Sequence, residues 1–304
     1  MGGCGLETSE HGSGDSEKRR CPTPMPTPAL SDEYPNGVTR CGRRSTPLYI
    51  TLVSPELDEQ RPGVGADGGW AASAEAWITS VDRDIARFVL DPIMLRLAGA
   101  VDGARVLDVG CGEGRFCRML SKRGARCMGI DPTALLLRTA RERGADAIDP
   151  ARAVAEALPF AASTFDLAVS YITLVDIEHY REAITEMARA LKPGGHLLAA
   201  NISFVSASQD ENGGWVRDTD GKRLHIPIDN YIDESSRVYE WDGIRIRNYH
   251  RPLSAYMRAY LGAGLLLREF LEPTPDEKYR GLADYDGAAF RVPWFTVMLW
   301  EKPH

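Results

Sequence analysis

The stretch Arg105–Leu120, RVLDVGCGEGRFCRML, decides how the rest of the sequence is interpreted. An apolar run ends in an acid at Asp108, and glycines then occupy every second position, at Gly110, Gly112 and Gly114. The pattern predicts a buried strand, a tight turn and a helix. Because glycine lets a ligand approach bare backbone at the start of a helix, the turn indicates a binding site. A tight turn without a ligand is the alternative for three glycines alone.

A second acid narrows the choice of ligand. Asp131 ends the next predicted strand, ARCMGID, where a carboxylate can accept both hydroxyls of a ribose. The glycines are spaced G-x-G-x-G rather than G-x-G-x-x-G, and there is no G-x-x-x-x-G-K-[ST] run for a triphosphate. Asp108 would repel a pyrophosphate at the turn. The residues therefore favour an adenosine-containing ligand with a positive charge, such as an ammonium or a sulfonium group.

The composition sets broad limits. The chain has 304 residues, a net charge of −7 and 43% apolar residues, which is typical of a soluble globular protein. The negative charge argues against a nucleic-acid partner, and no apolar run approaches the ~18 residues of a membrane span. Six cysteines are scattered without a C-x-x-C pair. We therefore expect reduced thiols in a cytoplasmic protein, with no metal site.

The chain divides into a leader and a patterned region. Residues 1–65 are rich in Gly, Pro, Ser and Thr and predict a disordered leader. Helical spacing begins near Trp70, and Pro92 is expected to break this region into two helices. Apolar strands then alternate with helices up to about Phe204, which predicts a doubly wound parallel α/β sheet. A polar, aromatic-rich segment follows as an insertion, and a helix and two strands end the chain. Whether these last strands pair antiparallel stays open.

Four motifs in order resemble class I S-adenosylmethionine-dependent methyltransferases. VLDVGCGEGRF resembles their motif I, and GIDPT is similar to the acidic ribose-binding strand end. AEALPFAASTFDLAVS is similar to the adenine-side loop and fourth strand, and ALKPGGHLLAA to the turn into strand five. These motifs cover about Gly103–Asn201. The tail, NYHRPLSAYMRAYLGAGLLLREFLEPTP, resembles small-molecule members of the ubiquinone-biosynthesis-like group.

The resemblance implies a fold and a domain plan. We expect a Rossmann-like methyltransferase fold: a doubly wound, mostly parallel seven-stranded sheet with a small insertion after strand five. Residues 66–304 would form one methyltransferase domain, with about 204–250 as a lid over the methyl acceptor.

The resemblance also implies a site for S-adenosyl-L-methionine at the strand ends. The glycine turn and its acid would hold the amino-acid part, the second acid the ribose, and the next loop the adenine. The implied cofactor residues are Asp108, Gly110, Cys111, Gly112, Gly114, Asp131, Pro132, Ala155, Glu156, Ser170 and Trp77. Val154 aligns with an Asp that binds the adenine amino group in many relatives, so we expect adenine recognition here to be either looser or made by backbone groups.

Three residues are candidates for the acceptor side. His250 is the first candidate general base, with a helix-capping role as its alternative. Tyr171 is the second, with a role as a rim aromatic as its alternative. Asp176 either lines the acceptor or caps a helix. The aromatic residues of the insertion form either an aromatic acceptor pocket or a small satellite core: Trp215, Tyr231, Tyr239 and Trp241.

Methyl transfer to a small-molecule O or N acceptor is the leading hypothesis for the function. A NAD(P)-dependent oxidoreductase on a similar fold is the first alternative, and the glycine spacing and Asp108 argue against it. A non-catalytic relative that keeps the cofactor site is the second alternative. Fold alone does not decide among them.

Overall fold

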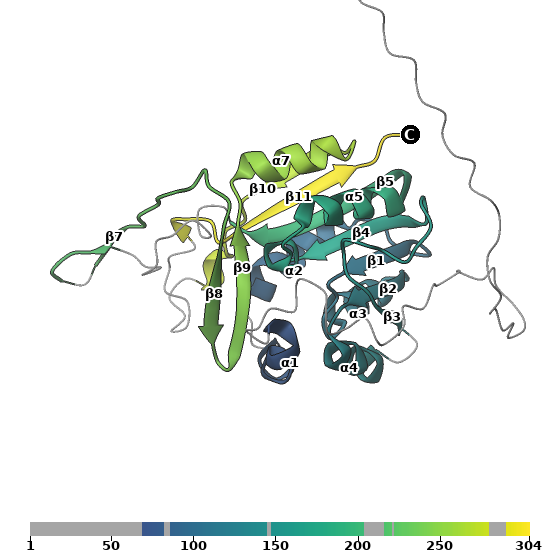
Figure 1. Ribbon diagram of the computed structural model, residues 1–304, viewed down its shortest axis with the longest axis horizontal. Coiled ribbons are helices and arrows are strands. Elements are labelled where there is room, and N and C mark those ends of the chain that lie inside the picture. Colours follow the sequence, from purple (N-terminus) through teal and green to yellow (C-terminus); the bar gives the residue numbers. More distant parts are fainter. Residues whose placement is uncertain (1–68, 82–85, 145–146, 204–215, 221, 280–289) are drawn as a thin grey trace, which may run out of the picture. The chain divides into compact units, whose positions relative to one another are not determined.

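Seven strands of the computed structural model form one mixed sheet in the order β10-β11-β5-β4-β1-β2-β3 (Figure 1). The structure describes residues 69–304 apart from 82–85, 145–146, 204–215, 221 and 280–289. The predicted leader, residues 1–65, and Trp215 therefore lie outside the described residues.

Five parallel strands make the predicted doubly wound part of the sheet. They are β1 (Arg105–Val109), β2 (Arg126–Asp131), β3 (Ile148–Arg152), β4 (Phe165–Tyr171) and β5 (Leu191–Ile202). Helices on both faces bury such strands, which explains their nearly continuous apolar sequences. The PGG turn expected before β5 lies inside the strand, where the register with β4 shifts after Phe165.

Helices connect these strands. They are α3 (Arg115–Ser121), α4 (Ala134–Gly144) and α5 (Tyr180–Ala190), with a short 3-10 turn, η4 (Leu174–Asp176), before α5. Because parallel strands joined by helices all point the same way, the carboxyl ends of β1, β2 and β4 meet at one edge. The glycine turn, Asp131 and η4 all follow those ends.

The chain ends in the antiparallel part of the sheet. Helix α7 (Leu253–Gly262) leads to β10 (Leu266–Leu271), and the 3-10 turn η5 (Glu277–Tyr279) precedes β11 (Phe295–Glu301). Strand β11 lies between β5 and β10 and pairs antiparallel with both. This settles the pairing that the sequence left open and completes the predicted seven strands.

Two helices precede the sheet, and Pro92 does not separate them. Helix α1 spans Gly69–Ser80 and α2 spans Ala86–Leu97, so Pro92 lies inside α2. The predicted break was therefore wrong. Leu90 and Met94 on either side of the proline are fully buried, and we attribute the continuity of α2 to this packing, which outweighs one missing backbone hydrogen bond.

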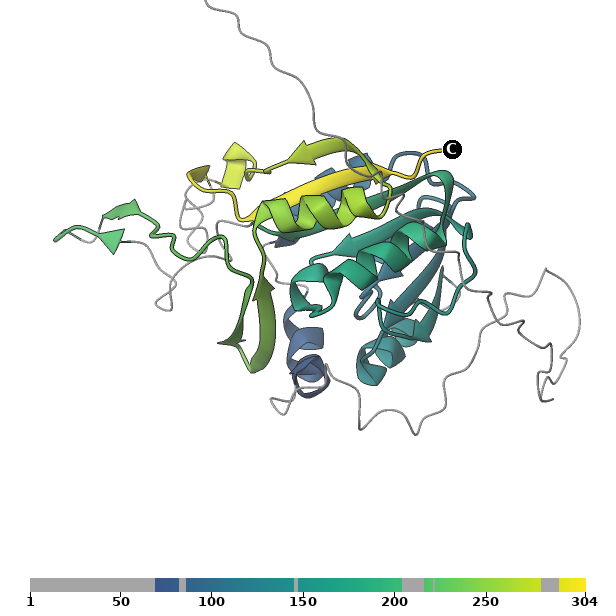
Figure 2. The same cartoon turned by 45° about the horizontal axis from the view of Figure 1, so that its top comes forward.

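The segment after β5 is the expected insertion, and its described part consists of two hairpins. Strands β6 (Val216–Arg217) and β7 (Arg223–His225) form a small outer hairpin. Strands β8 (Ser235–Trp241) and β9 (Ile244–His250) form a longer one, called here the lid hairpin. Figures 1 and 2 show α1 between this hairpin and α4, beside the sheet edge that carries the glycine turn.

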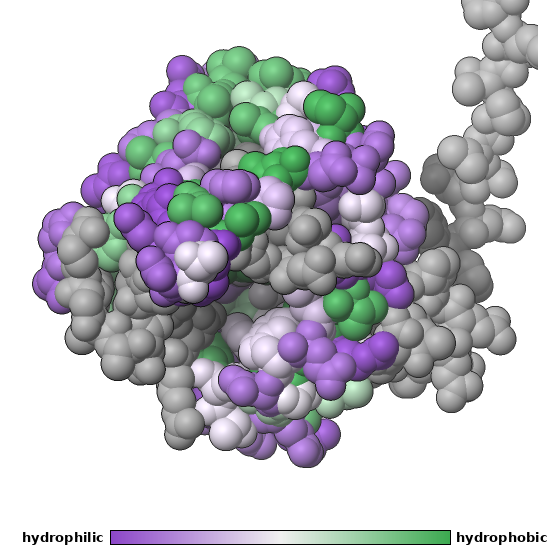
Figure 3. Space-filling view, turned by 90° about the vertical axis from the view of Figure 1, so that its left-hand side faces the viewer, coloured by the Kyte–Doolittle hydropathy of each residue, from purple (hydrophilic) through white to green (hydrophobic). Residues whose placement is uncertain are grey.

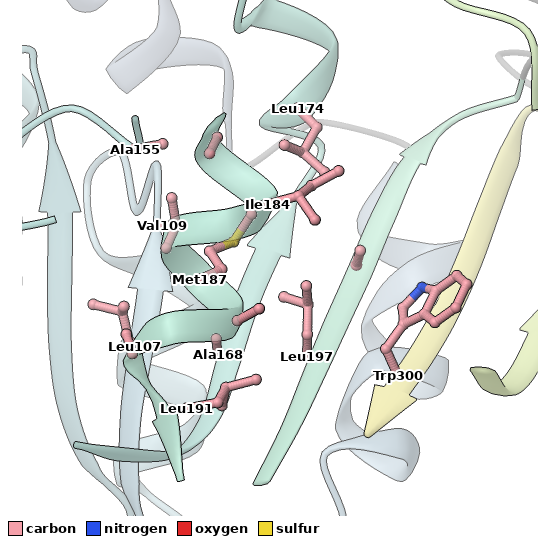
Figure 4. Close-up of a cluster of buried hydrophobic side chains, with 14 of the residues drawn as sticks. Leu107, Val109, Ala155, Ala168, Leu174, Ile184, Met187, Leu191, Leu197 and Trp300 are labelled. Carbon is pink, nitrogen blue, oxygen red and sulfur yellow. The ribbon is translucent and has the colours of Figure 1, made fainter. Parts of the chain in front are cut away.

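Apolar side chains fill both faces of the sheet. On one face α5 and α7 pack against Leu107, Val109, Leu197 and Trp300. Figure 4 shows the part of this cluster under α5. On the other face α2 and α3 pack against the alternate residues of the strands, such as Val106 and Val169. Asp108 points to this second face, where it meets α3.

Candidate cofactor and acceptor site

The three glycines of the turn are not all explained by the same structural feature. All have positive φ, +74° at Gly110, +55° at Gly112 and +78° at Gly114, a region that costs other residues energy. A Cβ on Gly110 would lie 2.2 Å from Thr173 Cγ2, and one on Gly114 would lie 2.6 Å from Ile148 Cδ1. At Gly112 the nearest atom, a Trp77 ring nitrogen, is 3.7 Å away. Packing therefore explains two of the glycines, and Gly112 is the one that presents open backbone.

Asp131 holds this turn from the end of β2. Its Oδ2 accepts the Gly112 N–H at 3.1 Å, and its Oδ1 accepts the Thr133 N–H at 2.8 Å. Burial raises the pKa of Asp131, while the hydrogen bonds from Thr133 and Gly112 oppose that rise. Each carboxylate oxygen keeps further acceptor capacity for a ligand hydroxyl.

Asp108 is a buried acid with an unused acceptor. Its Oδ2 accepts a hydrogen bond from Cys117 Sγ at 3.3 Å, but Oδ1 has no partner among the described residues. Burial raises the pKa of Asp108 to about 6, although Cys117 and Arg115 oppose the rise. On the neighbouring strand, the buried Ser170 hydroxyl also lacks a partner within the described structure. Buried unpaired acceptors are costly, so this arrangement suits a ligand that brings donors, such as an ammonium group.

The predicted adenine side flanks Asp131 toward β3. Pro132 is exposed, and its carbonyl accepts a hydrogen bond from Arg152 Nε at 2.9 Å. Ala155 is buried and Glu156 half-buried in the loop after β3. Cys111, in the turn, is buried and its amide bonds Ile130 O at 2.9 Å. These residues thus lie around the ends of β2 and β3.

Tyr171 belongs to a network that the sequence did not reveal. Its hydroxyl donates to Asp91 Oδ1 at 2.8 Å, and Arg115 donates to Asp91 Oδ2 at 2.6 Å. The Arg115 guanidinium also lies over the Tyr171 ring, 5.3 Å from its centre. Burial, followed by the charge of Asp91, raises the pKa of Tyr171. A phenol that is already donating and is harder to ionise is a poor base, so these contacts disfavour the catalytic role predicted for Tyr171.

Asp176 connects three parts of the molecule. Its Oδ2 accepts the Trp70 indole N–H at 3.0 Å, and its Oδ1 accepts the side-chain amide of Asn248. Trp70 lies on α1, Asn248 on β9, and Asp176 itself at the end of η4. Burial raises the pKa of Asp176 to about 7, against the hydrogen bonds from Trp70 and Asn248. Asp176, which the sequence predicted to line the acceptor site, therefore also links α1, η4 and β9.

His250 ends the lid hairpin. Its Nε2 lies 2.8 Å from the Tyr231 carbonyl oxygen, which can only accept, so Nε2 carries the proton. The other ring nitrogen, Nδ1, is buried and has no hydrogen-bond partner in the described part of the chain. The next residue, Arg251, is buried and donates to the carbonyls of Leu174 and Glu178, each at 2.9 Å. Arg251 thereby fixes the base of the hairpin to the segment after β4.

Helix α1 covers the glycine turn. Trp77 lies over Gly112, and its ring meets Trp70 edge-on with 5.4 Å between centres. At the other end of the helix, Arg143 donates to the Ile78 carbonyl at 3.4 Å and to Glu113 at 3.0 Å. Neither Trp70 nor Arg143 carries a local sequence signal for this role.

A cavity of about 560 Å³ lies where the lid hairpin meets the ends of β5 and β11. Its volume falls within the range of small-molecule sites. Side chains from η4, β5, β8, β9 and β11, with Trp294 just before β11, line it: Val175, Ile202, Ser235, Ser236, Arg237, Tyr239, Trp241, Asn248, Tyr249, His250, Trp294 and Phe295. Tyr239 and Trp241, two of the aromatic residues singled out in the sequence, therefore line a cavity, whereas Tyr231 packs against the larger sheet core.

The strand order, the glycine turn between two acids and the cover from α1 define a Rossmann-like domain built for an adenosine ligand. Residues 107–199 match the methyltransferase domain family. The chain belongs, through this domain, to the class I S-adenosylmethionine-dependent methyltransferases, and the family implies S-adenosylmethionine as cofactor.

Solved structures and curated relatives agree with this family. An S-adenosylmethionine-dependent methyltransferase from Mesorhizobium loti is 27% identical with a TM-score of 0.62, over 69% of this chain and 96% of that one. A methyltransferase of the same kind from Listeria monocytogenes shares the fold at 21% identity, with a TM-score of 0.63 over 77% and 99% of the two chains. The demethylmenaquinone methyltransferase of Renibacterium salmoninarum is 35% identical over 38% of this chain and 47% of its own length.

The chain spans about a third to just over half of the length of the curated relatives it matches. Among the described helices, none has the length and apolar character needed to cross a membrane. The described residues contain no cluster of three or more His, Cys, Asp or Glu side chains suited to a metal ion.

Proposed function

We propose that this protein transfers a methyl group from S-adenosylmethionine to a small-molecule oxygen or nitrogen acceptor. The observation that carries the proposal is the pairing of open backbone at Gly112 with the buried, partnerless Oδ1 of Asp108. Gly112 offers room against the main chain, and Asp108 offers an acceptor for an ammonium group. An oxidoreductase role has no support from the family match.

The assignment of cofactor residues follows from these positions. Asp108 and the Gly110–Gly114 turn would hold the amino-acid end, and Asp131 the ribose. Pro132, Ala155 and Glu156 would border the adenine, Ser170 the methyl group, and Trp77 would close over the turn. When bound, S-adenosylmethionine supplies an electrophilic methyl group on a sulfonium. The protein's main task is then to hold the acceptor atom in line, about 3 Å from the methyl, and to exclude water.

We place the acceptor in the cavity beneath the lid hairpin. Its aromatic lining, with Tyr239, Trp241 and Tyr249, favours a planar acceptor. His250 lines the same cavity, and its Nδ1 is the ring nitrogen that would act as general base. Asp176 lies one residue beyond Val175, which also lines it. The lid hairpin would thus serve as the acceptor lid expected from the sequence, within one methyltransferase domain.

Surface character agrees with a small acceptor. Figure 3 views the side that carries the hairpins and shows apolar side chains scattered among polar ones. The net charge of −7 is unfavourable for a nucleic-acid partner. The three described cysteines, Cys111, Cys117 and Cys127, are free thiols, which supports the proposed reducing, cytoplasmic location.

The test is calorimetric titration with S-adenosylmethionine, S-adenosylhomocysteine and NADH, on the natural protein and on Asp108→Ala. We expect both adenosyl ligands to bind, NADH not to bind, and the variant to lose the adenosyl ligands. Transfer of labelled methyl to a panel of phenols and amines then tests catalysis. Binding of NADH alone would reject the proposal, and tight cofactor binding without turnover across the panel would favour a non-catalytic relative.

A further inference from the structure

Helix α1 and the lid hairpin are joined to each other as one cover. Ser73 Oγ donates to the Arg245 carbonyl at 3.1 Å and accepts the Arg245 N–H at 2.9 Å, so this α1 side chain pairs with β9 as another strand would. Near the hairpin tip, a Cβ on Gly243 would lie 3.5 Å from Ala76 Cβ, which is ordinary packing contact. Movement of either element would therefore carry the other.

This cover must move for a ligand to reach the turn. Trp77 Nε1 stands 3.7 Å from the position of a Cβ on Gly112, in the space above the open backbone. A ligand lying on Gly112 would need that space. The contacts that hold α1 down therefore control access to the turn.

Asp176 is the point at which the cover meets the sheet. It follows β4 on η4, whose Leu174 carbonyl is held by the buried Arg251. Its two carboxylate oxygens accept one donor from each half of the cover, Trp70 on α1 and Asn248 on the lid hairpin. Both donors are uncharged, so no cation offsets the carboxylate charge through these two bonds.

We propose that Asp176 is a positioning residue that latches the cover over the cofactor turn, and that the latch is closed when its carboxyl is neutral and opens when it ionises. This proposal rests on the proposed function, because the ligand that the cover admits is the adenosyl cofactor.

Asp176 can bond to both Trp70 and Asn248 in either protonation state. A neutral Asp176 can accept from Trp70 on Oδ2 and donate from Oδ1 to Asn248, once the Asn248 amide turns its oxygen inward. The junction at Asp176 then carries no charge. An ionised Asp176 keeps both donors but stays half-buried, and opening the cover would return it to water. Ionisation therefore favours the open state.

The groups around Asp176 bring the pH at which its carboxyl ionises close to neutral. Burial raises the pKa of Asp176 to about 7; Asp131, from the end of β2, also raises it, and Arg251, from the end of β9, lowers it. His250 shares the β9 face with Asn248 and bonds Tyr231. The other charged or titratable side chains of β9 and α1 near the junction bond elsewhere or are exposed: Glu75, Arg245, Arg247 and Tyr249.

The direction of the pH dependence follows from the difference between the pKa of Asp176 in the closed and in the open state. The closed state holds its proton up to about pH 7, whereas an exposed carboxyl releases it near pH 4. The closed-to-open ratio therefore falls as the pH rises from about 4 to about 7 and levels off above that. Between pH 6 and pH 8 the closed-to-open ratio should fall about tenfold.

Stopped-flow binding of S-adenosylhomocysteine tests the latch, because that ligand requires no acceptor. In the natural protein, association and dissociation should both accelerate on the order of tenfold from pH 6 to pH 8. Asp176→Asn mimics the neutral carboxyl and should be slow at both pH values. Trp70→Phe removes one donor and should be fast at both. Thr79→Ala on α1, whose hydroxyl bonds the Glu75 carbonyl of its own helix, is the matched control and should behave like the natural protein.

Two results would overturn the latch. If Asp176→Asn keeps the pH profile of the natural protein, another group titrates. If dissociation changes in the variants while association does not, Asp176 and Trp70 contact the ligand directly and do not gate it. Amide hydrogen exchange of α1 without ligand gives a separate readout. At pH 8, α1 protection in Asp176→Asn should exceed that of the natural protein, and equal protection would reject the latch even if the cofactor assignment failed.

Discussion

Gly112 and Asp131 are joined directly: the Gly112 amide donates to Asp131 Oδ2 at 3.1 Å. The acid proposed for the ribose therefore also fixes the glycine with the open backbone. Asp131→Ala should weaken S-adenosylmethionine binding by roughly 1–3 kcal/mol, the scale of a hydrogen bond to a charged group. Calorimetry measures this change. Asp149→Ala, an exposed acid on β3, is the control, and an equal affinity in the two variants would refute the ribose assignment.

We expect the buried carboxylate of Asp108 to lower the stability of the folded protein and to strengthen cofactor binding. Its pKa of about 6 lies above the usual 3.8, so the folded state holds a proton that the unfolded chain releases. Its contribution to the free energy of unfolding therefore falls as the pH rises from about 4 to 6 and stays unfavourable above, by roughly 3 kcal/mol. Asp108→Asn should raise the free energy of unfolding at pH 8, leave it nearly unchanged at pH 4, and weaken cofactor binding.

Urea denaturation at the two pH values measures the effect. Asp166→Asn is a control of opposite sign, because the Lys192 ammonium lowers the pKa of Asp166 despite partial burial. This variant should be slightly less stable than the natural protein at pH 8. If Asp108→Asn also loses stability at pH 8, the carboxylate is stabilised in the fold without a ligand, and the proposed cost of its burial is wrong.

The glycine turn permits a test that separates packing from binding. Gly110→Ala would drive a methyl group to 2.2 Å from Thr173 Cγ2 and should lower the melting temperature by several degrees. Gly112→Ala meets no atom nearer than 3.7 Å and should cost less stability, yet it should still reduce cofactor affinity at least as much as Asp131→Ala. Thermal melts and calorimetry on both variants check this. Full cofactor affinity in Gly112→Ala would show that no ligand lies on that backbone.

His250→Ala should lower turnover more than cofactor binding. A general base contributes about 10²–10⁴-fold to rate, whereas His250 is not among the residues proposed to hold the cofactor. Once an acceptor is known, kcat and cofactor affinity are measured in parallel. His196→Ala, a half-exposed histidine near Glu301, is the control. Equal losses of turnover and binding in His250→Ala would instead point to a structural role.

Removal of residues 1–65 should leave cofactor binding and the melting temperature unchanged, because the Gly, Pro, Ser and Thr content of this segment predicts a disordered leader. Calorimetry and a thermal melt on the shortened chain check this. A large drop in melting temperature would show that the removed segment packs on the domain, and a loss of affinity alone would place it at the site.

The sequence predicted the features that depend on local signals. The glycine turn, Asp131 at the end of β2 and the alternating strands and helices each follow from a short run of residues. The contacts of the cover do not. Tyr171 and Asp91 are 80 residues apart, and Trp70 and Asp176 are 106 apart, so no local pattern pairs them. The helix break predicted at Pro92 was wrong for the same reason, because the packing of α2 on the sheet is a long-range effect.

Strand β11 has a consequence for synthesis. It lies inside the sheet, between β5 and β10, although Phe295–Glu301 is the last strand in sequence order. During translation β5 leaves the ribosome about a hundred residues before its antiparallel neighbour and waits with an open edge. The nascent domain can therefore close its sheet only after residue 301 has emerged, so a chain cut short before β11 should be prone to aggregation.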